Sequence, residues 1–253
     1  MKIIKYKKGA KGLYKVDLED GTVLSLYEEV ILKYNLLLTK EVDDSTKDEM
    51  FDYNLECEVY YVALNNIKAR AKSENDLRKF LLNKEYPTEL VDKAIEKLTS
   101  QGYLNDRSYA KSFINSQIIT TSNGPLKIER ELLDKKIDYK IIAEELEVFS
   151  EEEQLNKIDK IIRKMIRSNH TRGGMVLKQK IFNDLKNYGY DVSVINRIID
   201  DYDFNNGEDD IAKKEYDKLY TKYSRKYSGA ELQRKIKEKL YLKGLKYEPK
   251  END

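Results

Sequence analysis

Lysine and arginine side chains are the residues whose spacing in this sequence best suits a chemical role. The stretch from residue 160 to residue 183 carries seven of them and no acidic residue. Within it Arg163 and Arg167 stand four positions apart, so on a helix they project from the same face. Guanidinium and ammonium groups gathered in this way suit phosphate or an acidic protein surface. The sequence therefore indicates a binding surface for an anionic partner.

Basic residues also recur at an equivalent place in a repeated helical pattern, shortly before a predicted break between two helices. Charge at the equivalent position of each copy would form a stripe able to follow a filament or a phosphate backbone. Two plainer interpretations stay open, because such residues also suit the dipole at a helix C-terminus and lysines commonly solvate exposed helix faces. The predicted binding residues are Lys68, Arg70, Lys72, Lys127, Arg130, Arg163, Lys164, Arg167, Arg172, Lys178, Lys180, Lys222, Arg225 and Lys226.

Other chemistries find little support in the sequence. No glycine-rich phosphate loop of either common type occurs, which argues against a nucleotide enzyme. A zinc site needs three or four ligands at workable spacing, and beyond carboxylates only Cys57 and His170 are present. His170 precedes a double glycine, which predicts a loop. The 46 acidic residues form no recognisable acid–base motif, so we predict no catalytic site, no metal and no cofactor.

A helical pattern that repeats at intervals of just over fifty residues must position these side chains. Leu81, Leu132, Leu185 and Leu240 can be superimposed at spacings of 51, 53 and 55 residues. An apolar residue stands four positions before each of these leucines, and another stands five positions after. Such self-similarity is typical of one unit copied and stacked, and stacks of this kind usually bind extended partners.

Each copy of the pattern reads as three helices. In the first copy we predict helices over residues 49–71, 74–84 and 87–100. Ser73 is a suitable N-cap for the second of them, because its hydroxyl can accept a hydrogen bond from a free backbone N–H. Gly102 is suited to end the third in a left-handed conformation. The fourth copy is followed by a polar tail and lacks a third helix.

The 20 tyrosines raise the question of base stacking, because nucleic-acid bases stack on aromatic rings. Tyr86, Tyr103, Tyr109 and Tyr190 fall at apolar positions of the repeat or beside them, which favours packing inside and between copies. A further stripe in the fourth copy is predicted either to pack or to face a partner. It consists of Tyr216, Tyr220, Tyr223 and Tyr227.

The first fifty residues differ from the rest. Short strands are predicted over Ile3–Lys8, Leu13–Leu18 and Thr22–Leu26, followed by a helix over residues 27–38. The predicted fold is mainly α, with tandem three-helix repeats in a curved elongated array behind a small N-terminal β-containing element. The predicted divisions are 1–50 for that element, 51–104, 105–150 and 151–206 for three repeats, and 207–253 for a partial fourth repeat with a polar tail.

Composition supports a soluble protein built from amphipathic helices. Charged residues make up 37% and apolar residues 40% of the chain. No apolar stretch approaches the roughly 20 residues needed to span a bilayer, and the lysine-rich start has no apolar region behind it, so it is not a signal peptide. Cys57, the single cysteine, cannot form an internal disulfide. We therefore predict a cytoplasmic monomer with no membrane partner.

Two segments carry a specific signature. Residues 102–114 read GYLNDRSYAKSFI and residues 123–137 read NGPLKIERELLDKKI. Together they resemble the RecX regulatory protein family, although members often place an arginine beside the Gly-Pro pair and this chain does not. The matching residues are Gly102, Tyr103, Leu104, Asn105, Asp106, Tyr109, Ala110, Phe113, Gly124, Pro125, Lys127, Ile128, Glu131, Leu132, Lys136 and Ile137.

The resemblance implies a non-enzymatic regulator of homologous recombination, DNA repair and the SOS response. Proteins of this family bind the RecA recombinase filament on DNA and inhibit its strand exchange and ATP turnover. The expected partners are the RecA filament and, more weakly, single-stranded or double-stranded DNA. One alternative is a helical-repeat nucleic-acid-binding protein that acts without RecA, and another is a helical scaffold for a different protein.

Overall fold

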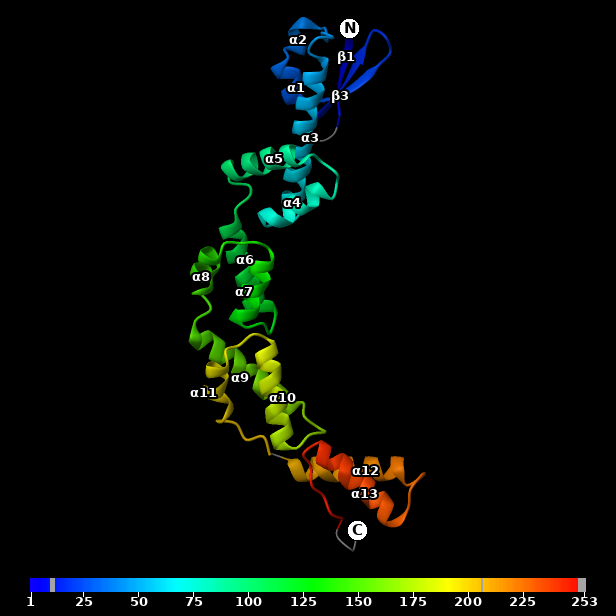
Figure 1. The fold of residues 1–253 in the computed structure, drawn as a ribbon, viewed down its shortest axis with the longest axis vertical. Coiled ribbons are helices and arrows are strands. Elements are labelled where there is room, and N and C mark those ends of the chain that lie inside the picture. Colours follow the sequence, from blue (N-terminus) through cyan, green and yellow to red (C-terminus); the bar gives the residue numbers. More distant parts are fainter. Residues whose placement is uncertain (10–11, 206, 250–253) are drawn as a thin grey trace. The chain divides into compact units, whose positions relative to one another are not determined.

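The computed structural model describes residues 1–9, 12–205 and 207–249. Within these residues the chain forms thirteen helices and one three-stranded sheet (Figure 1). The prediction of a mainly α fold, with three-helix repeats behind a small β-containing element, is confirmed. The chain divides into two compact bodies, Met1–Lys111 with Asp134–Ile141, and Ser112–Leu133 with the residues from Ile142 onward.

The N-terminal sheet is an antiparallel meander of β1 (Ile3–Lys8), β2 (Leu13–Leu18) and β3 (Val23–Tyr27). Alternating residues of β2 and β3 are buried, as the period-2 pattern predicts. Gly21 turns β2 into β3 with a φ of 84°, a left-handed conformation that favours glycine. The three predicted strands are confirmed to within one residue at each end.

The predicted helix over residues 27–38 is wrong in one respect, because it is broken into two. Helix α1 covers Glu28–Lys33 and α2 covers Leu36–Thr39, with Asn35 between them at a φ of 51°. Asparagine tolerates this left-handed conformation better than most residues, so it permits the break. The break buries Leu36, whose carbonyl accepts a 2.6 Å hydrogen bond from the Tyr6 hydroxyl.

Helix α3 (Lys47–Ala69) joins the sheet to the first repeat. Its Asn54 side chain covers the outer edge of β3, accepting a hydrogen bond from the Tyr27 N–H at 3.0 Å and donating one to the Ser25 carbonyl at 3.2 Å. Two helical turns after Asn54, on the same helix, Tyr61 stacks on Tyr27 with ring centroids 4.9 Å apart. An otherwise open sheet edge is thereby closed, which removes a template for aggregation.

The repeats follow in order along the chain. The first three each have three helices, and within residues 243–249 no third helix follows the two of the fourth. The helices are α3, α4 (Glu74–Leu82) and α5 (Thr88–Ser100); α6 (Asp106–Thr120), α7 (Pro125–Asp134) and α8 (Tyr139–Leu146); α9 (Glu151–Arg167), α10 (Gly174–Asn187) and α11 (Val192–Ile199); and α12 (Glu208–Tyr223) and α13 (Gly229–Leu242).

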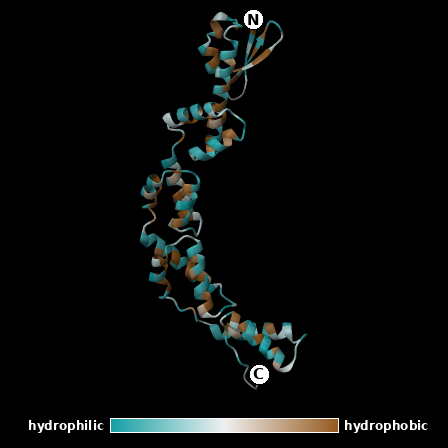
Figure 2. Ribbon diagram, viewed as in Figure 1, coloured by the Kyte–Doolittle hydropathy of each residue, from teal (hydrophilic) through white to brown (hydrophobic). Residues whose placement is uncertain are grey.

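The leucine that defines the repeat is fully buried in the second helix of every copy. Leu81, Leu132 and Leu185 are 0% exposed and Leu240 is 1% exposed. The apolar residue four positions earlier is buried with each of them, since i and i+4 share one helix face. Figure 2 shows the resulting arrangement, with apolar residues gathered where the helices of a repeat meet and polar residues outside.

Each second helix ends in the same way. The residue four positions after the shared leucine has a positive φ in all four copies: Glu85 at 63°, Lys136 at 62°, Gly189 at 86° and Gly244 at 73°. A left-handed residue of this kind terminates a helix and turns the chain. The repeat therefore conserves a backbone conformation even where the residue type changes.

Within the second body, consecutive repeats touch through backbone at glycine. The N–H of Gly124 donates to the Tyr188 carbonyl at 2.7 Å, and the N–H of Gly173 donates to the Lys243 carbonyl at 2.8 Å. A Cβ at Gly124 would lie 2.7 Å from the carbonyl carbon of Gly189. The start of one second helix thus lies directly against the end of the next.

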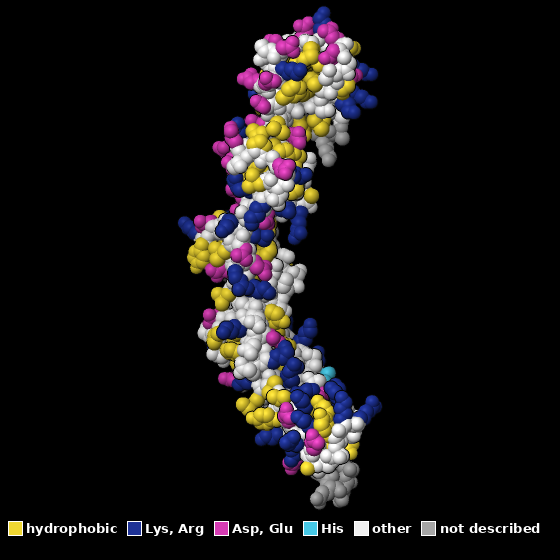
Figure 3. Space-filling view, turned by 45° about the vertical axis from the view of Figure 1, so that its right-hand side comes forward, with side chains coloured by type: hydrophobic (Ala, Val, Ile, Leu, Met, Phe, Trp, Pro, Cys, Tyr) yellow, Lys and Arg dark blue, Asp and Glu magenta, His cyan; other side chains and the backbone are white. Residues whose placement is uncertain are grey.

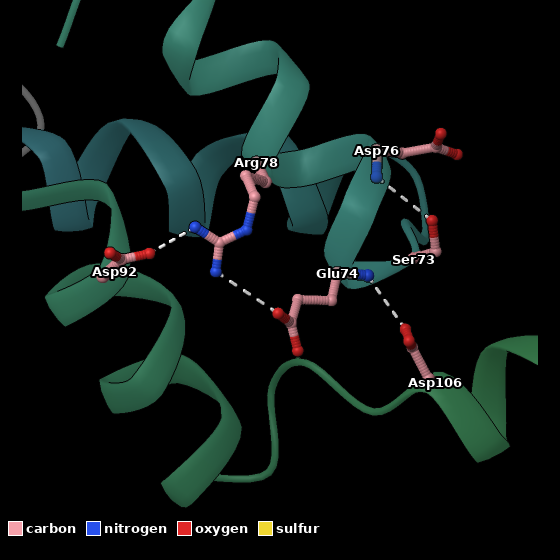
Figure 4. Close-up of polar contacts among 6 residues, drawn as sticks. All are labelled: Ser73, Glu74, Asp76, Arg78, Asp92 and Asp106. Carbon is pink, nitrogen blue, oxygen red and sulfur yellow. Dashed lines mark hydrogen bonds and ion pairs between the residues drawn. The ribbon is translucent and has the colours of Figure 1, made fainter. Parts of the chain in front are cut away.

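Carboxylates from the following repeat also cap the second helices. Asp106 accepts a 2.8 Å hydrogen bond from the Glu74 N–H, while Ser73 accepts one from Asp76, as predicted for the N-cap (Figure 4). In the second body Glu208 accepts from the N–H of Gly174 at 2.8 Å. Such contacts satisfy backbone N–H groups that a helix N-terminus otherwise leaves unpaired.

Replacing Gly189 by Ala should destabilise the chain more than replacing Gly102. Both glycines have positive φ, so both variants incur about 1–2 kcal/mol of backbone strain. A Cβ at residue 189 would also lie 2.5 Å from the Lys127 nitrogen, whereas residue 102 has open space. The clash should add about 1–3 kcal/mol, measurable as a lower urea midpoint. Equal midpoints for the two variants would contradict the tight contact.

Asp106→Ala should cost about 1 kcal/mol through the lost cap, and Asp106→Asn less, because the amide oxygen still accepts. Burial raises the pKa of Asp106, while the Glu74 N–H opposes that rise. A pKa raised by folding contributes stability below the unfolded value and loses it as pH rises through the folded value. Wild type should therefore gain stability relative to Asp106→Asn when urea unfolding is measured from pH 7 down to about pH 4; a constant difference would contradict this.

Candidate functional site

Helix α9 carries the most concentrated positive charge among the predicted binding residues. Ser150 caps its start by accepting a 3.2 Å hydrogen bond from the Glu153 N–H. Glutamates fill the first turn and basic residues the last, which suits the helix dipole at both ends. Ile158 and Ile162 are fully buried against the third repeat. Burial of this face fixes which side of α9 meets solvent.

The solvent side of α9 forms a basic stripe. Lys160, Arg163, Lys164 and Arg167 are spaced at i, i+3, i+4 and i+7, so they share one face. With Ser168 they line a hollow of about 380 Å³. Lys160 was not among the predicted binding residues, although the same spacing in the sequence was enough to find it. We call these four cations the α9 stripe.

The four charges of the α9 stripe are not equally available. Arg163 Nε donates to both carboxylate oxygens of Asp159, at 2.8 and 2.9 Å. The Tyr202 hydroxyl also donates to Asp159, and this hydrogen bond followed by those from Arg163 lowers the pKa of the carboxyl. Lys164 and Arg167 make no ion pair with any residue that the structure describes. Lys160 is exposed and likewise has no ion pair among these residues, so Lys160, Lys164 and Arg167 carry the free positive charge.

Lys178 and Lys180, on α10, are engaged within their own repeat. The Lys178 ammonium lies 2.5 Å from Asp200, and Lys180 pairs with Asp184 one turn further along α10. Arg172 lies in the loop before α10, where its carbonyl accepts a 2.7 Å hydrogen bond from Asn169. Both lysines thus have an intramolecular partner. The i, i+4 spacing of Lys180 and Asp184 is visible in the sequence, whereas the pairing of Lys178 with Asp200 is not.

The remaining predicted residues lie in three other places. Arg70 and Lys72 follow α3 and line a second hollow, of about 440 Å³, in the first body. Lys68 is exposed on the last turn of α3. The others lie on α7 and at the end of α12, mostly exposed; they are Lys127, Arg130, Lys222, Arg225 and Lys226.

Charge on the surface is mixed. Figure 3 shows acidic and basic side chains interspersed over the upper part of the view, and more Lys and Arg in the lower part, which holds the C-terminal repeats. A mixed surface of this kind is ordinary for a helical protein. The α9 stripe is set apart by its helical spacing and by three cations that have no ion pair within the described residues.

Tyrosine packing follows the prediction only in part. Tyr190 is 1% exposed and Tyr216 is buried, in agreement with a packing role. Tyr103, predicted to pack, is 54% exposed, because the turn after Gly102 directs Leu104 into the core instead. Tyr220 is also exposed, so the predicted stripe on α12 is divided between core and surface.

Among the residues in the described ranges, no helix is both long and apolar enough to cross a bilayer. Across the same ranges, no three His, Cys, Asp or Glu side chains are grouped to hold a metal ion.

Comparison with known proteins assigns the family. The family model described as "RecX, second three-helix domain" matches residues 105–146, which span α6–α8. A protein of Lactococcus lactis subsp. cremoris named "Regulatory protein RecX" is 32% identical over 249 residues, covering 95% of this chain and 93% of the relative. The chain belongs to the RecX family.

Other members support the assignment. A protein of the same name from Streptococcus agalactiae is 28% identical to this RecX family member, over 98% of this chain and 96% of its own. A solved "Crystal structure of regulatory protein RecX" superimposes with a TM-score of 0.68 at 26% identity, covering 79% of this chain and 99% of that one. A RecX structure from Lactobacillus salivarius, at 22% identity and a TM-score of 0.55, shares the fold over 59% of this chain and 97% of its own.

Tyr202→Phe should raise the pKa of Asp159 towards its ordinary value. The Tyr202 hydroxyl makes the hydrogen bond that most lowers this pKa, and phenylalanine keeps the ring while removing the donor. The carboxyl resonance of Asp159, followed by NMR over a pH titration, measures the change. Tyr220→Phe is the matched control, because the Tyr220 hydroxyl makes no hydrogen bond to Asp159. An unchanged pKa in Tyr202→Phe would show that the hydroxyl does not hold the carboxylate.

Proposed function

We propose that this chain is a non-enzymatic regulator that binds the RecA–DNA filament and inhibits recombinase and ATPase activity, thereby modulating recombination and repair. It would act as a cytoplasmic monomer. Family membership supports the class of function, and the α9 stripe is the observation that carries the contact. Its three unpaired cations, Lys160, Lys164 and Arg167, would meet DNA phosphates or the acidic surface of the filament.

The repeat architecture supports an extended partner. In a tandem repeat protein each unit offers the same surface again, so a partner with its own periodicity can be met at several points. Cations before the break between first and second helices recur in the first, third and fourth repeats. Each contact of this type is individually weak when exposed, so binding would depend on several acting together.

A second candidate is a nucleic-acid-binding protein that acts without RecA. The hollow beside Arg70 and Lys72 favours it, because additional lysines line that hollow. The two functions differ in their response to bare DNA. A protein held mainly by phosphates should lose affinity steeply as salt rises, whereas a filament regulator should prefer RecA-coated strands at the same salt.

The decisive experiment is the DNA-dependent ATPase rate of the cognate RecA on single-stranded DNA, with this chain titrated below equimolar. The rate should fall at low molar ratios. The double substitution of Lys164→Glu and Arg167→Glu should raise the concentration for half-inhibition about tenfold or more, because it reverses two unpaired charges on one face.

Lys186→Glu is the control for that series. Lys186 is exposed near the end of α10 and has no ion pair within the described residues, so reversing its charge alters net charge alone. Inhibition by this variant should match wild type. An ATPase rate that stays constant up to equimolar wild-type chain would sink the proposed function and leave the nucleic-acid alternative.

A further inference from the structure

The hollow in the first body is built from parts that lie far apart in the sequence. Residues after α3, one face of α4, the first turns of α6 and the turn before α8 line its volume of about 440 Å³. Small-molecule sites are concave and typically about 300–1,000 Å³. We call it the first-repeat cavity. Its size suits a small ligand or one residue of a polymer.

The charge around this cavity is strongly positive. Arg70, Lys72, Lys79 and Lys135 line it, against a single carboxylate, Asp76. Lys135 Nζ forms an ion pair with that carboxylate, 2.7 Å from Asp76 Oδ2. The other three cations have no ion pair with residues in the described part of the chain. Three uncompensated cations around one concavity are suited to phosphate, including the singly charged phosphodiesters of a nucleic-acid backbone.

Two aromatic rings also line the cavity, together with Ala71 and Asn83. Phe80 lies on α4 and is half-buried, and Tyr109 lies on α6, also half-buried. The Lys135 ammonium stands 5.8 Å from the Tyr109 ring centroid. Partly exposed ring faces beside cations provide both components of nucleotide recognition, since phosphates bind cations and bases stack on rings.

Lys135 keeps its charge in this position. Burial acts to lower the pKa of Lys135, but the hydrogen bond to Asp76 and the neighbouring Tyr109 outweigh it, so the pKa is raised. The ammonium therefore stays protonated at neutral pH. Lys135 and Asp76 together fix one wall of the cavity in place by linking the turn after α7 to the start of α4.

We propose that the first-repeat cavity binds a nucleoside phosphate, with the phosphate held by Arg70, Lys72 and Lys79 and the base against Phe80 and Tyr109. This deepens the proposed function, on which it rests for the source of the ligand, a nucleotide within single-stranded DNA. A duplex does not fit this role, because its bases are stacked and paired and cannot reach a ring that lines a concavity. An acidic peptide would use the cations and leave the rings without a role.

The test measures binding of a short fluorescent thymidine oligonucleotide to the full chain without RecA. Lys79→Glu should weaken binding about tenfold or more, because Lys79 is exposed and unpaired and the change reverses a charge at the phosphate. Phe80→Leu keeps an apolar side chain of similar bulk while removing the ring. It should weaken binding about fivefold or more at every salt concentration, since stacking is not screened by salt.

Lys111→Glu is the matched control. Lys111 is an exposed lysine two positions after Tyr109, and so lies on the other side of α6. It should bind as wild type does. Equal weakening by Lys79→Glu and Lys111→Glu would overturn the proposal by showing nonspecific electrostatic attraction. Full binding by Phe80→Leu would also overturn it, by showing that the cavity binds anions through its cations alone, as it would bind an acidic peptide.

Two further arms locate the ligand and its source. Crosslinking with 5-iodouracil in the oligonucleotide should map to Phe80 or Tyr109, and crosslinks confined to α9 would overturn the proposal. Competition by thymidine monophosphate would assign a free nucleotide as a ligand of the same cavity. Competition by the oligonucleotide alone would assign a nucleotide within a strand. None of these experiments uses RecA. A negative result in the RecA ATPase assay would therefore contradict the proposed function without deciding whether the first-repeat cavity binds a nucleotide.

Discussion

The stacking of the repeats depends on how the N-termini of α4, α7 and α10, the second helices of the first three repeats, are satisfied. The first N–H groups of a helix have no partner within it. Here the following repeat supplies that partner: Asp106 accepts from Glu74, the Tyr188 carbonyl accepts from Gly124, and Glu208 accepts from Gly174. The hydrogen bonds that satisfy the start of one second helix therefore also connect successive repeats. We call this set of contacts the joint.

The joint has two chemical forms with one geometry. Where the two backbones touch directly, glycine is needed on both sides, as at Gly124 and Gly189. At α4 the Asp106 carboxylate makes the contact and Ser73 caps the same helix from its own side. At α10 the Glu208 carboxylate and the backbone contact of Gly173 occur together. The left-handed residue after the shared leucine is common to both, because it brings the end of one second helix against the start of another.

The same joint explains where the candidate binding residues gather. The chain between a first and a second helix carries basic residues, and the turn of the following repeat lies beside the second helix. In the first body this brings Lys135 to Asp76, with Arg70 and Lys72 lining the same hollow. The α9 stripe arises differently, from a single helix whose buried face fixes the exposed one. In the first body, the contacts that stack the repeats and the candidate binding residues thus share the region at the helix break.

The sequence alone determined what is periodic. Buried leucines at the repeat interval, the strands of the meander, the Ser73 cap and the i, i+4 pair of Arg163 and Arg167 all follow from local spacing. Tertiary structure decided what depends on neighbours distant in the chain. The left-handed break at Asn35, the exposure of Tyr103, the pairing of Lys178 with Asp200 and the meeting of Lys79 with Lys135 have no local signal. Helical periodicity reports which face is buried, whereas a cavity or an ion pair requires that two separate faces be brought together.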